Sequence, residues 1–170
     1  MAGAATHRLS LPGPMLRRGF WLYVWDVETP CGQMLYVGRT GDNSSPHATA
    51  PYTRMGQHLG FAPNQNALRR QLTARNINPE DCARFDLVAH GPIHDEVSGG
   101  LDEDRTSLMA RHLPLRNLVG AMEKALADEL KQVGYDVMNS VSWRFDYDPA
   151  TWQQVRAAFA QSFPKLEALR

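Results

Sequence analysis

The chain has 170 residues, of which 43% are hydrophobic and 21% are charged, with 18 acidic and 18 basic groups. This length and composition are typical of one globular domain with a hydrophobic core, and they exclude a disordered or fibrous chain. The formal net charge of zero also argues against the strong non-specific binding to duplex nucleic acid that basic proteins show.

Residues 1–15 are small, polar and interrupted by Pro and Gly, so we expect a loose N-terminal arm and not a signal peptide. No apolar run approaches the ~20 residues that a membrane-spanning helix needs. Cys31 and Cys82 lack the spacing of metal ligands, and reduced thiols are favoured over a disulfide. We therefore expect a cytoplasmic protein without a membrane segment.

Two aromatic-rich segments, residues 21–25 and 34–40, predict two β-strands. The residues between them include a Pro and a Gly, which favour a hairpin over about 19–40. Pairing of the strands would place Tyr23 and Tyr36 side by side. Taken alone, strand tyrosines usually pack their rings and expose their hydroxyls, and these two need no other explanation.

Residues 41–51 are rich in turn formers and predict a surface loop. A short helix is expected over about 52–59. A second helix is expected over about 65–75, with Asn64 as a candidate N-cap.

Basic side chains occur on both predicted helices. Arg54 and His58 are four residues apart, which places them on one helix face, as in many surface helices. Arg69, Arg70 and Arg75 either form a patch that faces phosphate or lie on the solvated face of the second helix. The sequence does not choose between these interpretations.

Residues 84–90 alternate between apolar and polar side chains and predict a third strand. His90 and His94 flank a Gly-Pro-Ile segment that is expected to turn the chain. A third metal ligand of the right kind is missing nearby, so both histidines are interpreted as exposed loop residues.

Acidic residues concentrate after the third strand, where residues 81–105 include seven Asp or Glu and two Lys or Arg. Residues 1–80 have the opposite bias, with eight Lys or Arg and four Asp or Glu. We expect residues 92–113 to form an acidic insertion without a core of its own.

Pro114 is expected to begin the longest helix, which would end at Gly134. Its apolar residues recur at helical spacing along one stripe. Glu123 and Glu129 lie on the two edges of that stripe, so periodicity does not choose between the two carboxylates. Asp148 followed by Pro149 predicts the start of a C-terminal packing helix.

Several segments, in this order, resemble the motifs of the GIY-YIG nuclease family. They are Leu22-Tyr23, Tyr36-Val37-Gly38, Arg54-Met55-Gly56-Gln57-His58, Glu123-Lys124-Ala125-Leu126 and Asn139. The likeness covers about residues 19–140, and the joint order is fairly specific although either strand motif alone is weak. The chain departs from the family pattern at Trp21, which stands where Gly is usual, and in longer segments before Arg54 and over 76–113. Arg39 is an alternative for part of the role of Arg54.

The resemblance implies an α/β fold of the α+β type, with a small antiparallel three-stranded sheet flanked by helices, loop insertions and a C-terminal helix. Residues 16–145 would form the nuclease-like domain, and residues 146–170 a helical element packed on it. The implied activity is that of an endonuclease that hydrolyses DNA phosphodiester bonds with one Mg²⁺ or Mn²⁺.

The resemblance also implies a role for each motif residue. Glu123 would hold the metal, and Tyr36 would take a proton from the attacking water, with Arg39 as the cation that favours its phenolate. Arg54 would bind phosphate oxygens, Tyr23 and His58 would position water or phosphate, and Asn139 would brace the site. The residues expected to contact nucleic acid are Gly38, Arg69, Arg70 and Arg75.

The alternative is a catalytically silent nucleic-acid-binding or protein-interaction module on the same scaffold, which the neutral charge and the acidic insertion favour. The expected partner is DNA, with a protein partner or a homodimer as further options. An RNA nuclease is a third and weaker option.

Overall fold

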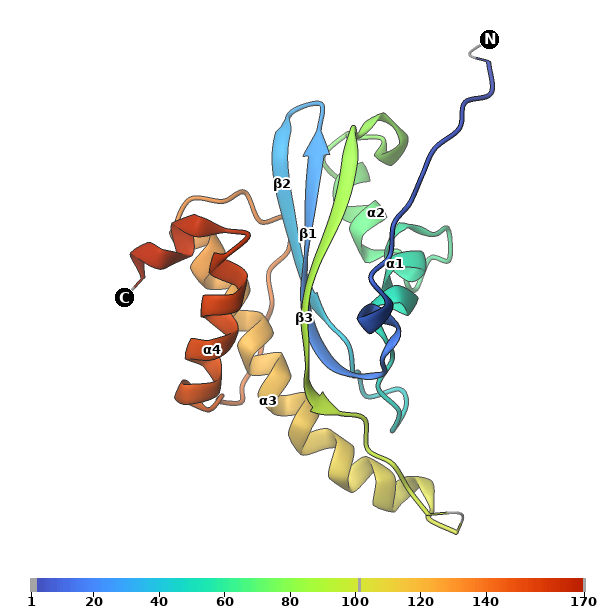
Figure 1. Cartoon of the computed structure of the whole chain (residues 1–170), viewed down its shortest axis with the longest axis vertical. Coiled ribbons are helices and arrows are strands. Elements are labelled where there is room, and N and C mark those ends of the chain that lie inside the picture. The colour runs from blue at the N-terminus through green and yellow to red at the C-terminus, as the bar shows by residue number, and fades with distance from the viewer. Residues whose placement is uncertain (1–2, 101, 170) are drawn as a thin grey trace.

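A three-stranded antiparallel sheet forms the centre of the fold in the computed structural model, which describes residues 3–100 and 102–169 (Figure 1). Its strands are β1 (Gly19–Thr29), β2 (Gly32–Arg39) and β3 (Arg84–Asp95), in the order β2-β1-β3. The α+β fold with an antiparallel three-stranded sheet, expected from the sequence, is confirmed. The predicted hairpin is confirmed too, with Thr29 opposite Gly32 at its end.

The central strand β1 is buried along most of its length because both of its faces are covered. Alternate side chains of a strand point to opposite faces. Phe20, Leu22 and Val24 therefore enter one hydrophobic cluster, whereas Tyr23 and Trp25 enter another. This division explains why residues 20–25 of β1 are all aromatic or apolar and do not alternate with polar residues.

Two pairs of helices cover the two faces of the sheet (Figure 1). On one side lie α1 (Pro51–Leu59) and α2 (Ala67–Thr73); on the other lie α3 (Arg105–Gln132) and α4 (Pro149–Ala160). Short 3-10 helices occur at Gly13–Leu16, Pro79–Asp81 and Pro164–Ala168.

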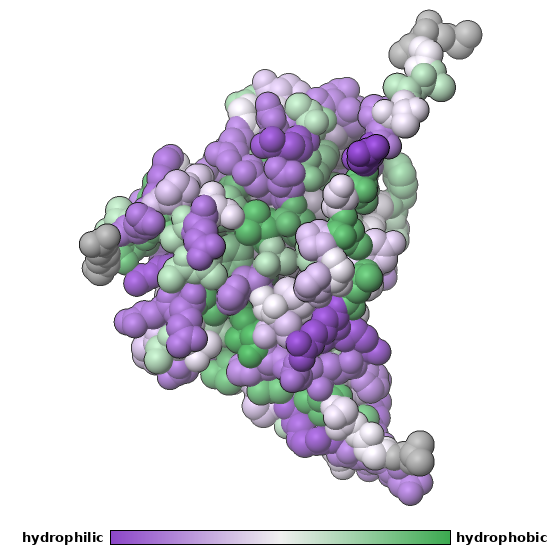
Figure 2. Space-filling view, viewed as in Figure 1, coloured by the Kyte–Doolittle hydropathy of each residue, from purple (hydrophilic) through white to green (hydrophobic). Residues whose placement is uncertain are grey.

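The hydrophobic cluster between the sheet and the helices α3 and α4 includes Val119, Leu126 and Phe159. Phe159 belongs to α4, so the C-terminal helix packs into the same core as the sheet. In Figure 2, hydrophobic residues gather in the middle of the viewed face, where the sheet meets α4, and hydrophilic residues surround them.

None of the described helices has both the length and the apolar character needed to cross a membrane. Cys31 and Cys82 are both free.

The longest helix begins nine residues earlier than expected, at Arg105, and Pro114 lies inside it. The side chain of Asp104 caps this start by accepting a hydrogen bond from the backbone N–H of Ser107, at 2.7 Å. Pro114 is exposed, so its missing N–H removes one helical hydrogen bond without burying an unsatisfied group. The expected acidic insertion over 92–113 is therefore wrong in extent, because only residues 96–104 connect β3 to α3.

The third strand also continues further than expected, to Asp95, and pairs with β1 again at Phe20 and Gly19. The Gly-Pro-Ile segment is not a turn but an irregularity in this strand, opposite Trp21. His90 and His94 are consequently half-buried strand residues and not exposed loop histidines. Their rings pack edge-on against Phe159 and Phe20.

Two cap predictions have different outcomes. Asn64 does not cap α2, which begins at Ala67 after Asn66 and has no side-chain hydrogen bond at its N-cap. Asp148 does cap α4, because its carboxylate accepts from the backbone N–H of Thr151 at 2.7 Å.

Candidate functional site

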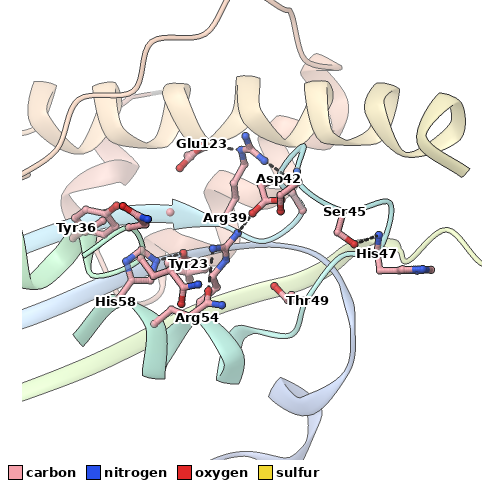
Figure 3. Close-up of a pocket in the computed structure, with 17 residues that line it drawn as sticks. Tyr23, Tyr36, Arg39, Asp42, Ser45, His47, Thr49, Arg54, His58 and Glu123 are labelled. Atoms are coloured by element: carbon pink, nitrogen blue, oxygen red, sulfur yellow. Dashed lines mark hydrogen bonds and ion pairs between the residues drawn. The ribbon is translucent and has the colours of Figure 1, made fainter. Parts of the chain in front are cut away.

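A cavity of about 560 Å³ opens beside the C-terminal end of β2, away from the turn of the β1–β2 hairpin, between α1, α3 and the loop of residues 41–50 (Figure 3). Most of the candidate site residues named from the sequence line this cavity, although Tyr23 and Glu123 are 100 positions apart in the chain. Those brought together are Tyr23, Tyr36, Gly38, Arg39, Arg54, His58 and Glu123.

Tyr23 enters the cavity from β1, opposite Gly38 on β2. A Cβ atom at Gly38 would lie 2.5–2.6 Å from the ring and hydroxyl of Tyr23, so only glycine leaves room for this side chain. The Tyr23 hydroxyl lies 2.6 Å from Nε2 of His58. Gly38 thus positions Tyr23 by its lack of a side chain.

His58 is buried on α1 against the edges of both tyrosine rings. Burial, together with the charge of Arg54, lowers the pKa of His58 to about 4, so the ring is neutral at pH 7. Burial raises the pKa of Tyr23 well above its ordinary value, so its hydroxyl stays protonated. The hydroxyl therefore donates a hydrogen bond to Nε2 of His58. The proton of the imidazole is then on Nδ1, which has no hydrogen-bond partner in the described residues.

Tyr36 lies next to His58, with only 9% of its surface exposed. Burial and the negative charge of Glu123 raise its pKa to about 12, against the charges of Arg54 and Arg70. The cations that favour the Tyr36 phenolate include Arg54 and Arg70. Arg39, which the sequence suggested for this role, forms an ion pair with Glu123, and its effect on Tyr36 stays a prediction.

Arg39 and Glu123 form an ion pair across the cavity, with Nε 2.9 Å from Oε2 and side chains only 11% and 15% exposed. Arg39 also donates to the carbonyl oxygen of Gly41. Burial raises the pKa of Glu123, although the neighbouring arginine charges act in the opposite direction. Within the described residues, Oε1 of Glu123 accepts no hydrogen bond, so one carboxylate oxygen faces the cavity.

The structure also distinguishes the two carboxylates that helical periodicity left equivalent. Oε1 of Glu129 accepts a hydrogen bond from Nε1 of Trp152 at 3.0 Å and lies 3.7 Å from Arg156. Both partners belong to α4, away from the cavity. Glu123 alone of the two reaches the site.

Arg54 is held by a residue that sequence reasoning missed. Its Nη2 lies 2.9 Å from Oδ2 of Asp42, and its Nη1 donates to Gln57 at 3.0 Å. Burial acts to raise the pKa of Asp42, but hydrogen bonds from Ser44 and Arg54 outweigh it and keep the pKa below its ordinary value. Asp42 is the one acidic residue in the turn-rich segment 41–51, and that signal was available in the sequence.

The N-terminal turns of α3 hold the Asp42 loop in place. Nε2 of the buried His112 lies 2.7 Å from the carbonyl oxygen of Asp42, and Arg105 donates to the carbonyl oxygen of Ser44 at 2.8 Å. The segment expected to be an unpacked insertion therefore positions one side of the cavity.

Asn139 does not line the cavity and lies along the outer edge of β2. Its side-chain amide donates to the carbonyl oxygen of Val37 at 2.8 Å and accepts from the N–H of Val37 at 3.0 Å. The preceding residues pair with the same strand through Leu35 and Val137. Asn139 thus braces the strand that carries Tyr36.

The three arginines of α2 and its C-terminal end do not line the cavity. Arg69 pairs with Glu80 at 2.8 Å, and Arg75 donates to the carbonyl oxygen of Met138 at 2.8 Å. Both therefore stabilise the packing of α2 and its neighbours. Arg70 is exposed and acts on the site through its charge, which lowers the pKa of Tyr36.

Of the two carboxylates that line the cavity, Asp42 already accepts hydrogen bonds at both oxygens, from Ser44 and Arg54, so a metal at this site would be held by Glu123. Within the described part of the chain, no three His, Cys, Asp or Glu side chains gather in a group that could hold an ion. Mg²⁺ commonly keeps several water ligands and is bound by one or two carboxylates. The free carboxylate oxygen and the volume of the cavity fit a hydrated ion of this kind.

Comparisons with known proteins find no matching family model, no matching curated protein and no matching solved structure. Interpretation of the site therefore depends on its residues and geometry.

Proposed function

We propose that the protein is a metal-dependent endonuclease of the GIY-YIG type that hydrolyses DNA phosphodiester bonds. The observation that supports this most strongly is the convergence of Tyr23, Tyr36, Arg54, His58 and Glu123 on one open cavity. These residues come from β1, β2, α1 and α3. A fold that needed them only for packing would have no reason to direct their polar atoms into a common space.

The charges around the cavity suit a phosphodiester. Arg39 and Arg54 reach it from two sides, and both lower the pKa of Glu123. Guanidinium groups bind phosphate oxygens with two parallel hydrogen bonds and stabilise the negative charge that builds on them during hydrolysis. Arg54 would exchange its contact with Asp42 for a phosphate oxygen.

In the proposed mechanism, Glu123 would hold Mg²⁺ or Mn²⁺, which supplies Lewis-acid stabilisation of the leaving oxygen. Tyr36 would accept the proton of the attacking water as the phenolate, after its own hydroxyl proton has been lost. With a pKa of about 12 it is protonated at pH 7, and the charge of Glu123 contributes to that value. Any cation that neutralises Glu123 therefore lowers the pKa of Tyr36 and favours the base. Nδ1 of His58 is buried, so His58 would act on the site by holding the hydroxyl of Tyr23 at 2.6 Å from its Nε2.

The decisive experiment compares cleavage of supercoiled plasmid and of single-stranded, duplex and branched oligonucleotides in Mg²⁺ or Mn²⁺. We expect wild-type cleavage and a loss of at least about 100-fold in Glu123→Gln, since the proposed metal ligand is removed. Glu129→Gln is the matched control on the same helix and should cleave normally. Its amide keeps an acceptor for Trp152.

Thermal unfolding should show little difference between Glu123→Gln and the wild-type protein. Failure to cut any DNA form over wide ranges of protein and metal would count against the proposal. So would a Glu123→Gln variant as active as the wild-type protein. RNA oligonucleotides in the same assay separate an RNA nuclease from a DNA nuclease.

A silent binding module remains the second candidate, because both cavity arginines are already paired with carboxylates of the chain, Asp42 and Glu123. DNA binding in EDTA without cleavage in metal would favour it. Binding to a protein partner or self-association, without DNA affinity, would favour its protein-interaction form. A cytoplasmic location, where free thiols stay reduced, is part of the proposal.

A further inference from the structure

A second, shallower pocket of about 380 Å³ is lined by aromatic and basic side chains. Most of them belong to the segment that follows Asn139 in the sequence. Its residues are Arg116, Ser142, Trp143, Arg144 and Phe145. Trp143 is half-buried and Phe145 is 39% exposed, with their ring centroids 6.1 Å apart. We refer to these five residues as the Trp143 patch.

Arg39 connects the Trp143 patch to the cavity. Its guanidinium carbon lies 4.7 Å from the centroid of the Trp143 ring, and the same guanidinium forms the ion pair with Glu123. Arg116 contacts the same ring, at 4.6 Å. Arg116 and Glu123 are seven residues, or about two turns, apart on α3, so they share one helix face. A strand whose phosphate entered the cavity would therefore continue over this patch.

Trp143 is fixed in this position before any ligand arrives. Its Nε1 donates to the carbonyl oxygen of Asn117 at 2.9 Å. Its indole ring lies directly on Gly120, where a Cβ atom would come within 2.3–2.7 Å of it. A ring held by a hydrogen bond and by close packing loses little conformational freedom on binding, which favours affinity.

The two arginines of the patch have no carboxylate partners in the part of the chain that the structure describes. Arg144 lies over the Phe145 ring at 5.0 Å. Arg116 donates to the side-chain oxygen of Asn117, and its Nε is buried without a partner. Burial and the like charge of Arg39 lower the pKa of Arg116. An anion at this position would offset the repulsion between the guanidinium groups of Arg116 and Arg39.

We infer that the Trp143 patch binds a single-stranded DNA segment next to the phosphate in the cavity, with a base stacked on Phe145 and a backbone phosphate on Arg116. The choice of DNA depends on the proposed function. Bases stack on exposed aromatic rings only when they are unpaired, whereas phosphate contacts alone serve any strand. The protein should therefore prefer substrates in which the strand next to the cleaved bond is unpaired.

The test measures binding in EDTA, so that cleavage plays no part. The probes are a fluorescent thymidine oligonucleotide and an oligonucleotide of equal length made of abasic sites, which has the same backbone charge. We expect Phe145→Ala to weaken binding of the thymidine probe by about tenfold or more and to leave binding of the abasic probe unchanged. Arg116→Gln should weaken both probes and reduce the slope of log affinity against log salt by about one.

Phe61→Ala is the matched control. Phe61 is another exposed phenylalanine stacked with an arginine, Arg69, at 4.3 Å, but it lies between α1 and α2 on the other side of the sheet. The Phe61→Ala variant should bind both probes with the same affinity as the wild-type protein. Far-ultraviolet circular dichroism checks that each variant is folded.

Equal affinity of Phe145→Ala and wild type for the thymidine probe would overturn the inference, as would an equal loss in Phe61→Ala or on the abasic probe. The inference and the proposed function fail separately. A base-dependent loss in Phe145→Ala with no cleavage by the wild-type protein would refute the nuclease and keep the patch. Normal cleavage by the wild-type protein, together with unchanged binding by Phe145→Ala, would keep the nuclease and refute the patch.

Discussion

At the scale of single residues, the closest packing in the site is between Gly38 and Tyr23. The sequence motif drew attention to Gly38 as a candidate contact for nucleic acid. The structure gives it a more local role, because the Tyr23 ring occupies the space of its missing side chain. The residue type was therefore informative, but the reason for it depends on the pairing of two strands.

We predict that Gly38→Ala displaces the Tyr23 hydroxyl from His58 and strongly reduces cleavage. Overpacking of this kind costs about 1–3 kcal/mol of unfolding free energy, which urea denaturation measures. Gly56→Ala is the control, since Gly56 is exposed on α1 and a Cβ there meets nothing within 4 Å. That variant should gain up to about 1 kcal/mol from its higher helix propensity. Normal activity in Gly38→Ala would show that the Tyr23 contact is dispensable.

At the scale of elements, the sequence predicted the helices and strands that have strong local signals. It missed the ends of elements that lack such signals. Aromatic content identified β1 and β2, alternation identified β3, and the Asp148 cap marked α4. The start of α3 was missed because Pro114 is an equally good signal for a first helical residue. What extends the helix to Arg105 is tertiary: His112 and Arg105 bind the Asp42 loop, whose path the sequence does not reveal.

The position of Pro114 gives a prediction at this scale. Inside a helix, Pro lacks a hydrogen-bond donor and crowds the preceding turn, so Pro114→Ala should raise the unfolding free energy by about 1–3 kcal/mol. Pro51 stands at the first position of α1, where proline is favoured, and Pro51→Ala should be neutral or destabilising. Urea denaturation of both variants measures the difference. Destabilisation by Pro114→Ala would mean that the helix depends on the proline.

At the scale of the whole molecule, the sheet separates two hydrophobic clusters, and the site lies where α1 and α3 approach its two faces. The sequence indicated most of the cavity residues because they occur in short motifs. Asp42 was missed although it is the one acidic residue of its loop, and Arg116 and Trp143 were not indicated because they belong to a helix face and to a segment without regular structure. Their importance comes from three-dimensional neighbours, and no local pattern reports these.

The folded molecule should lose stability in mild acid partly through His58, which lies between Tyr23 and Tyr36. Its pKa is lowered from 6.5 to about 4, so the unfolded chain binds a proton more readily than the folded one. The resulting stabilisation is complete above about pH 6.5 and disappears as the pH falls towards 4, by up to about 3 kcal/mol. Melting temperatures of wild type and His58→Gln over this range measure it. An identical decline in both proteins would contradict the assignment.

The short segment that ends at Asn139 has a consequence for how copies of this protein meet. By bonding to Leu35 and Val37, it covers part of the outer edge of β2, which would otherwise offer free peptide groups to another chain. The opposite border of the sheet, along β3, has no neighbouring strand among residues 3–100 and 102–169. Association by strand addition is therefore favoured along β3, on the side remote from Tyr36, and would leave the cavity accessible.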